Sequence, residues 1–284
     1  MNVSVVIRTR DKERYFDSLL ESLASQTVQA SELVVVDNFS SEEKRRGLKN
    51  DLLETVREVF GKAKVDVKLV ALSDNEFSHA YSTNLGVAAA ENQLVCITNA
   101  HSLPSSQRWL QAGIRHFEDA KVAGVSGFFI PHREGTALRR FDKAVYQFTQ
   151  RAILRQDWCS TINCIIRKPL WHVYPFDENL VKIIPKTRKY GLEDYDWSKE
   201  MLARGFRIVV DPMFSVFHSH GRVLDETARN LRGYFVYRGI QQKINLLNRP
   251  RVSFSRVFQS GRSKSGIELL SQPTVLQAQP TSGR

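Results

Sequence analysis

The sequence predicts an α/β protein whose central, mostly parallel sheet carries helices on both faces. Segments of helical periodicity alternate with short apolar, β-branched runs at residues 3–7, 33–36, 67–71 and 94–98. Repeated strand–helix units of this kind are typical of parallel sheets. The 284 residues are 42% hydrophobic and 25% charged, which is an ordinary globular composition and enough for a sizeable core.

Each of the first three predicted strands is followed by a predicted helix. Residues 13–25 have an amphipathic pattern, residues 42–60 a charged helical pattern, and residues 79–90 a helical pattern of small side chains. In parallel sheets, ligands bind beyond the carboxyl ends of the strands. The residues that directly follow each strand are therefore the candidate site residues.

The second half of the chain has a different pattern. One helix is expected at residues 195–203, and strands are expected at residues 122–130, 160–167, 206–210 and 214–217. With so few helices between them, these strands are expected to extend the same domain with mixed directions, not to form a separate fold.

The cysteines and the lengths of the apolar runs also indicate where in the cell the protein is expected. The three cysteines, Cys96, Cys159 and Cys164, form no Cys-x-x-Cys pair, which indicates a reducing compartment and no structural zinc site. No run of about 18 apolar residues is present, so no membrane-spanning helix is expected. We expect a cytoplasmic protein.

Positive charge is concentrated near the end of the chain. Residues 222–264 hold ten Lys and Arg residues and two acidic residues. This segment therefore contributes +8 to the chain's net charge of +11. Apolar side chains recur there at roughly helical spacing: Tyr234, Tyr237, Ile240, Ile244 and Leu247. The pattern fits a helix packed on its own domain, or a basic amphipathic helix lying peripherally on an anionic membrane. Nucleic-acid binding is a third alternative, but no nucleic-acid partner is expected.

These patterns divide the chain into three parts. Residues 1–221 are expected to form one α/β domain, and residues 222–264 a basic amphipathic helical extension. The last part, residues 265–284, is expected to be a disordered tail, because its end is rich in Gln, Pro, Ser and Thr and has few large apolar side chains.

Four polar clusters stand at the ends of predicted elements. They are Asp37 after the second strand, Asn99-Ala100-His101 after the fourth, Glu193-Asp194 at the start of a helix, and His218-Ser219-His220 after the last strand. An α/β sheet would bring such clusters toward one edge.

The order and spacing of these clusters resemble the inverting glycosyltransferases of family 2, in particular a rhamnosyltransferase-like branch. The resemblance covers about residues 1–220 and rests on the segments VSVVIRT (3–9), LVVVDNFS (33–40), FSHAYSTNLG (77–86), ITNAHSLP (97–104), GLEDYDWS (191–198) and VFHSH (216–220). It implies the GT-A fold, the nucleotide-diphospho-sugar transferase fold. It also implies transfer of a sugar from a nucleoside-diphosphate donor to a glycan or lipid-linked acceptor in the synthesis of a surface polysaccharide.

For the donor, the resemblance implies that Asp37 contacts the nucleotide base. A carboxylate accepts the imide N–H of uracil or thymine, so a UDP- or dTDP-linked sugar is expected, with dTDP-rhamnose as the branch-level choice. The other residues expected to bind the nucleotide-sugar are Arg8, Thr9, Asn84, Asn99, Ser160 and Asn163.

The family's metal motif, Asp-x-Asp, falls on Asn99-Ala100-His101, where this sequence departs from the pattern. Mg²⁺ prefers oxygen ligands, whereas Mn²⁺ tolerates imidazole better. Two interpretations stay open: Mn²⁺ or Mg²⁺ held by His101 and His218, or a weakly metal-dependent enzyme in which His101 contacts phosphate directly.

The acidic pair matches the family's acceptor-side motif. The resemblance implies that Asp194 is the general base that deprotonates the acceptor hydroxyl, and that Glu193 orients the acceptor. Acidic residues at a helix start are also favoured by the helix macrodipole alone. Because Asn99 and His101 break the metal motif, the alternative function is a catalytically degenerate family member that binds a nucleotide or glycan without turnover.

Overall fold

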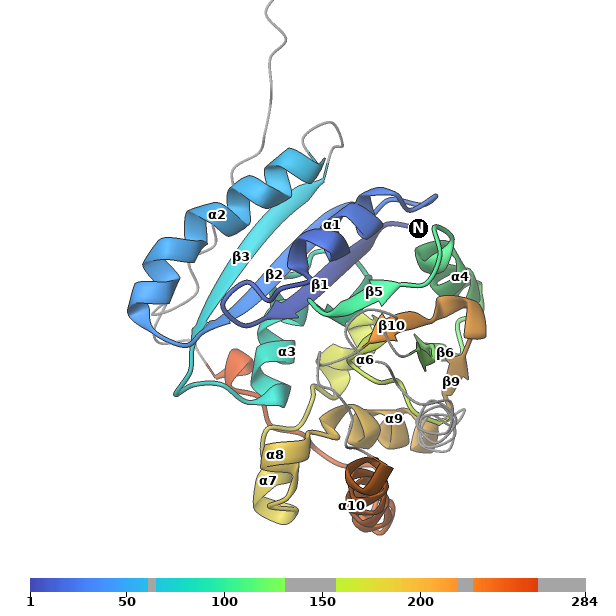
Figure 1. Ribbon diagram of the computed structural model, residues 1–284. Coiled ribbons are helices and arrows are strands. Elements are labelled where there is room, and N and C mark those ends of the chain that lie inside the picture. Colours follow the sequence, from blue (N-terminus) through green and yellow to red (C-terminus); the bar gives the residue numbers. More distant parts are fainter. Residues whose placement is uncertain (61–64, 131–156, 219–226, 260–284) are drawn as a thin grey trace, which may run out of the picture.

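The computed structural model describes residues 1–60, 65–130, 157–218 and 227–259 (Figure 1). They form an α/β fold around a seven-stranded sheet in the order β3-β2-β1-β4-β8-β6-β9, with a second, three-stranded sheet in the order β5-β10-β7. Within these ranges no helix has both the length and the apolar character that a membrane span would need.

The first half of the main sheet is parallel, as the sequence predicts. Strand β1 pairs in parallel with β2 and with β4, and β2 pairs in parallel with β3. The strands and the helices between them are β1 (Val3–Thr9), α1 (Phe16–Ala24), β2 (Glu32–Phe39), α2 (Glu42–Phe60), β3 (Asp66–Ser73), α3 (His79–Ala89) and β4 (Leu94–Asn99).

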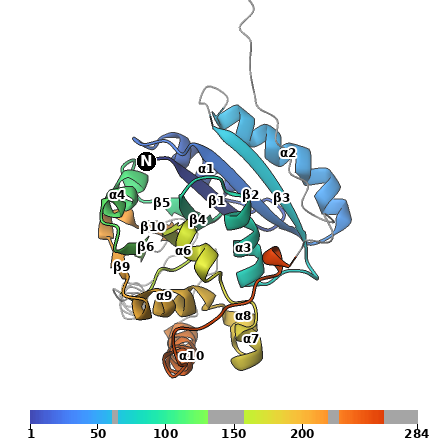
Figure 2. The same cartoon turned by 180° about the vertical axis from the view of Figure 1, so that it is seen from behind.

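Alternate side chains of each strand fill the two faces of this sheet. Val5 and Ile7 of β1 lie in one core cluster with α1 and α2, whereas Val6 lies in a second cluster with α3. Successive side chains of a strand point to opposite faces, so a continuous apolar run is buried only where helices cover both faces. Figures 1 and 2 show α1 and α3 on opposite sides of the sheet.

The first helix begins later than its periodicity predicts. It starts at Phe16 and not at residue 13, and before it the chain turns at Asp11 and Lys12, which both adopt positive φ angles, 53° and 51°. These angles are incompatible with a right-handed helix and turn the chain back toward β2.

The predicted long strand at residues 122–130 is wrong. The chain forms two strands that belong to different sheets, β6 (Val122–Ser126) and β7 (Phe129–Ile130). Between them, Gly127 approaches the Phe214 carbonyl so closely that a Cβ at this position would lie 1.6 Å from its oxygen. Only glycine permits this passage from one sheet to the other.

The second half extends the main sheet with mixed directions, as expected. Strand β8 is antiparallel to both β4 and β6, and β9 is parallel to β6. The predicted final strand at residues 214–217 starts later than expected, because Pro212–Phe214 forms a 3₁₀ turn before β10. The remaining elements are β5 (Ser102–Pro104), α4 (Trp109–Ile114), β8 (Asn163–Arg167), α6 (Lys168–Val173), α7 (Leu180–Ile183), α8 (Thr187–Tyr190), α9 (Glu193–Ala203), β9 (Arg207–Val210) and β10 (Val216–His218).

The basic extension packs on the domain where the structure describes it. It contains α10 (Thr227–Asn245), which contacts α9, and its Ile240 and Ile244 are buried in the main core. Three of its basic side chains, Arg249, Arg251 and Arg256, pair with carboxylates of the preceding domain. Residues 222–226 and the predicted tail at 265–284 lie outside the described ranges.

Candidate active site

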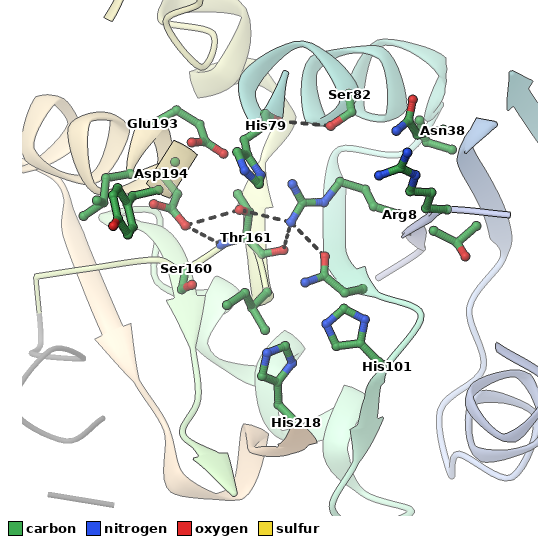
Figure 3. A pocket seen from close by; sticks show the side chains of 18 of the residues that line it. Arg8, Asn38, His79, Ser82, His101, Ser160, Thr161, Glu193, Asp194 and His218 are labelled. Atoms are coloured by element: carbon green, nitrogen blue, oxygen red, sulfur yellow. Dashed lines mark hydrogen bonds between the residues drawn. The ribbon is translucent and has the colours of Figure 1, made fainter. Parts of the chain in front are cut away.

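A cavity of about 520 Å³ lies at the carboxyl ends of the parallel strands. Its walls come from β1, β4, the residues before β8, the start of α9, β10 and α10. Predicted site residues that line it are Arg8, Thr9, Asn99, His101, Ser160, Glu193, Asp194 and His218 (Figure 3). The sheet topology thus brings together residues that are more than 200 positions apart in the chain.

Arg8 stands between the two halves of the cavity. Its Nη1 donates to Thr83 Oγ1 over 2.9 Å, and its Nη2 donates to Asn99 Oδ1 over 2.8 Å and to the Thr161 carbonyl over 3.0 Å. These contacts link β1, α3 and β4 to the loop before β8 (Figure 3). The guanidinium is therefore held in one position by three segments.

A strained turn aims the acidic pair into the cavity. Gly191 and Leu192 have φ angles of 71° and 77°, and α9 begins directly after them. A positive φ at leucine is unfavourable and tends to persist where a site requires it. Asp194 Oδ2 accepts hydrogen bonds from the Thr161 N–H, over 2.8 Å, and from the Thr161 hydroxyl, over 3.2 Å. The carboxylate is thus oriented toward the same loop that holds Arg8.

Burial makes both carboxyls of the pair harder to ionise. It raises the pKa of Glu193 to about 8, with a further contribution from Asp194, while Arg8 opposes the shift. Burial also raises the pKa of Asp194, against the hydrogen bonds from Thr161 and Tyr195. Carboxyls with raised pKa values in a cavity are candidates for proton transfer near neutral pH.

The two predicted imidazoles lie side by side on the opposite wall. The His101 and His218 ring centroids are 4.7 Å apart, and His218 Nδ1 lies 2.9 Å from Ser102 Oγ. His101 Nδ1 contacts a carboxylate oxygen of Glu13. His220 falls outside the described residues.

These donors do not fit a divalent metal ion. Within the described ranges, no three His, Cys, Asp or Glu side chains are grouped as metal ligands. The Asn99 oxygen already accepts a hydrogen bond from Arg8, so a cation faces it. Hard divalent ions need several oxygen ligands and are repelled by a nearby positive charge.

Asp37 is close to the cavity but does not line it. Its carboxylate is fully buried and accepts the N–H groups of Asp11, over 3.0 Å, and Lys12, over 3.1 Å. Burial raises its pKa to about 6. The predicted base-contacting carboxylate therefore holds the loop after β1, and the next residue, Asn38, reaches the cavity instead.

Asn84 and Asn163 are also placed differently from the prediction. Asn84 is fully buried behind the cavity, where it accepts the Trp171 indole N–H over 2.8 Å and donates to the Phe176 carbonyl over 2.8 Å. Asn163 accepts the Trp109 indole N–H over 3.2 Å and donates to the Phe214 carbonyl over 2.6 Å. Both amides fasten the core together and do not line the pocket.

Several cavity residues are not among the predicted site residues, namely Asn38, His79, Ser82, Trp158, Thr161, Tyr190 and Tyr237. The strand-end rule does select Asn38 together with Asp37, but it gives no role to Asn38. Tyr237 comes from α10, and its pKa rises to about 12 through burial and the nearby Asp194 and Glu193 charges. No local pattern signals that this helix reaches the site.

The raised pKa of Glu193 predicts a pH-dependent stability. The native carboxyl keeps its proton up to about pH 8, whereas its ordinary pKa is 4.5. Between these values the native state binds more protons than the unfolded state, so the free energy of unfolding falls as pH rises. Glu193→Gln cannot titrate, so we expect its stability relative to wild type to increase by roughly 1–3 kcal/mol from about pH 5 to about pH 8. Urea denaturation of both proteins at the two pH values measures this, and a constant difference would contradict it.

Comparison with known proteins identifies similar sequences and structures. The family model described as glycosyl transferase family 2 matches residues 4–170. No curated protein matches the chain. The fold itself is GT-A-like, since solved glycosyltransferase structures share it at low sequence identity.

Three of those structures illustrate the likeness. The mannosyltransferase PcManGT from Pyrobaculum calidifontis, in complex with GDP-Man and Mn²⁺, has a TM-score of 0.54 and 16% identity over 88% of this chain and 66% of its own. Glucosyl-3-phosphoglycerate synthase from Mycobacterium tuberculosis, with Mn²⁺, UDP and phosphoglyceric acid, has a TM-score of 0.53 and 15% identity over 87% and 80%. A fragment of S. aureus TarS has a TM-score of 0.52 and 18% identity over 84% and 65%. The chain thus spans about two thirds of the first and third of these structures.

Proposed function

The chain belongs to glycosyltransferase family 2, and from this premise we propose that it is an inverting glycosyltransferase. The proposed donor is a UDP- or dTDP-linked sugar, and the proposed acceptor is a glycan or lipid-linked sugar of a surface polysaccharide. The observation that carries the proposal is the single cavity that joins Arg8, the acidic pair and the two imidazoles. Such a cavity offers a cation for a diphosphate and a carboxylate for an acceptor hydroxyl.

In the proposed reaction, Asp194 acts as the general base. The acceptor oxygen attacks the anomeric carbon as its proton passes to Asp194, and the bond from that carbon to the donor phosphate oxygen breaks. The electron pair leaves on the nucleoside diphosphate, which needs no proton at neutral pH. Attack opposite the leaving group inverts the anomeric configuration. Glu193, whose pKa burial raises to about 8, donates a hydrogen bond that orients the acceptor in this proposal.

For the nucleotide base, we propose Asn38 in place of Asp37. Its Nδ2 donates to Asp74 Oδ1 over 3.1 Å, and its buried Oδ1 has no hydrogen-bond partner within the described part of the chain. An unsatisfied buried acceptor is unfavourable, and the imide N–H of uracil or thymine would satisfy it. No step is assigned to Mn²⁺ or Mg²⁺, because His101 and His218 belong to no group of three His, Cys, Asp or Glu side chains in the described part of the chain that could hold a metal ion.

A donor screen tests this function. UDP-, dTDP- and GDP-linked sugars are incubated with the full chain, and release of the nucleoside diphosphate is measured with and without glycan acceptors. Turnover that depends on Asp194 supports the transferase. Saturable binding by calorimetry without any Asp194-dependent turnover supports the degenerate family member instead.

Peripheral membrane contact is also proposed, through a surface next to the acidic pair. Helices α7, α8 and α10 lie together at one end of the molecule (Figures 1 and 2), and the Tyr190 and Tyr237 rings are 5.8 Å apart. The side chains of Ile183 and Phe235 are 51% and 68% exposed there. Exposed basic residues of α7, α8 and the segment between them are Lys182, Lys186, Arg188 and Lys189, and residues 179–192 contain no acid. Basic and apolar side chains together favour an anionic lipid surface.

Vesicle binding checks this surface. A variant with Lys182→Gln, Lys186→Gln and Lys189→Gln is expected to bind phosphatidylglycerol vesicles about tenfold or more weakly, because each basic residue contributes about 1 kcal/mol. The matched control changes three exposed cations elsewhere, Lys44, Arg46 and Lys121, to Gln. Equal loss in both triple variants would show that only net charge matters and would contradict a defined surface.

A further inference from the structure

A guanidinium occupies the position where the family's metal motif would place its ligands. Arg8 pairs with Asn99 in the parallel register of β1 and β4. Register partners on adjacent strands project to the same side of a sheet, and Arg8 Nη2 donates to Asn99 Oδ1 over 2.8 Å. The one motif residue with a side-chain oxygen is therefore already bound to a cation.

The charge of Arg8 is not neutralised by close acidic partners. Its hydrogen bonds go to the neutral oxygens of Thr83, Asn99 and Thr161. Burial lowers the pKa of Arg8, and the Glu193 and Asp194 charges oppose this from a greater distance, since within the described ranges no carboxylate forms an ion pair with it. A guanidinium stays charged in such surroundings, so the cavity wall carries a positive charge without a direct ion-pair partner.

Arg8 also keeps hydrogen-bond donors that the protein does not use. A guanidinium has five N–H groups. Nη1 donates to Thr83 alone, and the buried Nε has no partner in the described part of the chain. A buried donor without a partner is unfavourable and is expected to find one when a ligand fills the site.

We propose that Arg8 is the resident cation that neutralises the donor diphosphate, in place of a divalent metal ion. This inference rests on the proposed function. The guanidinium offers its charge and its remaining Nη1 N–H to the diphosphate, and its hydrogen bonds to Thr83, Asn99 and Thr161 fix it before the donor arrives. As the bond between the anomeric carbon and the phosphate oxygen breaks, negative charge grows on the leaving diphosphate beside a cation that needs no reorganisation.

Titration calorimetry with UDP, dTDP and GDP, in EDTA and then in Mn²⁺, tests the inference on the full chain. We expect at least one of these nucleotides to bind wild type with dissociation constants that differ by less than about threefold between the two conditions, because the cation belongs to the protein. Arg8→Gln is expected to weaken the binding of that nucleoside diphosphate by about 30-fold or more, and to weaken the binding of the matching monophosphate by less than about threefold.

Two further variants keep the test decisive if Arg8→Gln does not fold. Arg8→Lys retains the charge but not the planar fork, so a loss of about five- to tenfold is expected, without recovery in Mn²⁺. Arg108→Gln removes an exposed cation away from the cavity and is the matched control, with wild-type affinity expected.

The outcomes separate the inference from the function that it rests on. If wild type binds a nucleoside diphosphate only with Mn²⁺, or if Arg8→Gln binds as wild type does, Arg8 is not the resident cation but nucleotide-sugar transfer still stands. If none of the three nucleotides binds under either condition, the proposed function is wrong, and the inference with it.

Discussion

Asp194→Asn is expected to lower kcat for sugar transfer by about 10³-fold while donor binding changes little, because loss of a general base typically costs 10²–10⁴-fold. Asparagine has nearly the same shape, and its amide oxygen can still accept the hydrogen bonds from Thr161, whereas its amide nitrogen replaces the oxygen that accepts the Tyr195 N–H. Initial rates with a saturating donor, together with calorimetric donor affinity, measure the two quantities separately.

The pH profile gives a second measure of the same residue. Burial raises the pKa of Asp194, so wild-type kcat should fall on the acid side as this carboxylate takes up a proton. This acid limb should be absent from the residual activity of Asp194→Asn. Asp119→Asn, at a partly exposed surface carboxylate, serves as the control. Retention of more than about one tenth of wild-type kcat in Asp194→Asn would exclude Asp194 as the base, and a full loss in Glu193→Gln would point to its neighbour.

Arg251→Met is expected to destabilise the fold by about 3–5 kcal/mol, the usual cost of leaving a buried charge without its partner. Arg251 Nη2 lies 2.8 Å from Asp177 Oδ2, and Nη1 lies 2.8 Å from Asp196 Oδ1. Both carboxylates are buried, with 3% and 0% exposure. Arg249 still reaches Asp196, over 2.7 Å, so Asp177 is the charge left uncompensated. Urea denaturation measures the free energy of unfolding.

The matched control breaks an ion pair at the surface. Arg207 contacts Asp119, and their side chains are 63% and 41% exposed. Arg207→Met should therefore change stability by about 0–1 kcal/mol. A similarly small effect of Arg251→Met would mean that the segment after α10 does not anchor to the domain.

The contrast between local and distant partners explains which elements could be predicted. The order of strands and helices followed from local apolar periodicity, and α2 spans the predicted residues 42–60. The prediction of one strand over residues 122–130 is wrong because the break at Gly127 depends on Phe214, which lies about 90 positions away in the chain. A contact of that separation leaves no local pattern.

The same contrast applies to the site. Residues at strand ends, such as Arg8, Asn99 and His101, reached the cavity because parallel strands end at one edge. Asp37 and Asn38 are both polar and both follow the same predicted strand, so the sequence does not reveal which side chain faces the cavity. The choice depends on the loop at Asp11 and Lys12, whose N–H groups bind the Asp37 carboxylate. The structural roles of the Asn84 and Asn163 amides likewise depend on distant tryptophans.

By itself, the sequence determined the α/β class, the order of elements and the positions where chemistry was to be expected, because these depend on periodicity and on strand ends. Only the tertiary structure decided that Arg8 faces Asn99, that Tyr237 reaches the acidic pair, and that the basic extension pairs with buried acids. The physical reason is that side-chain charge and hydrogen bonding are settled by neighbours in space, which strand register and helix packing bring together from distant parts of the chain.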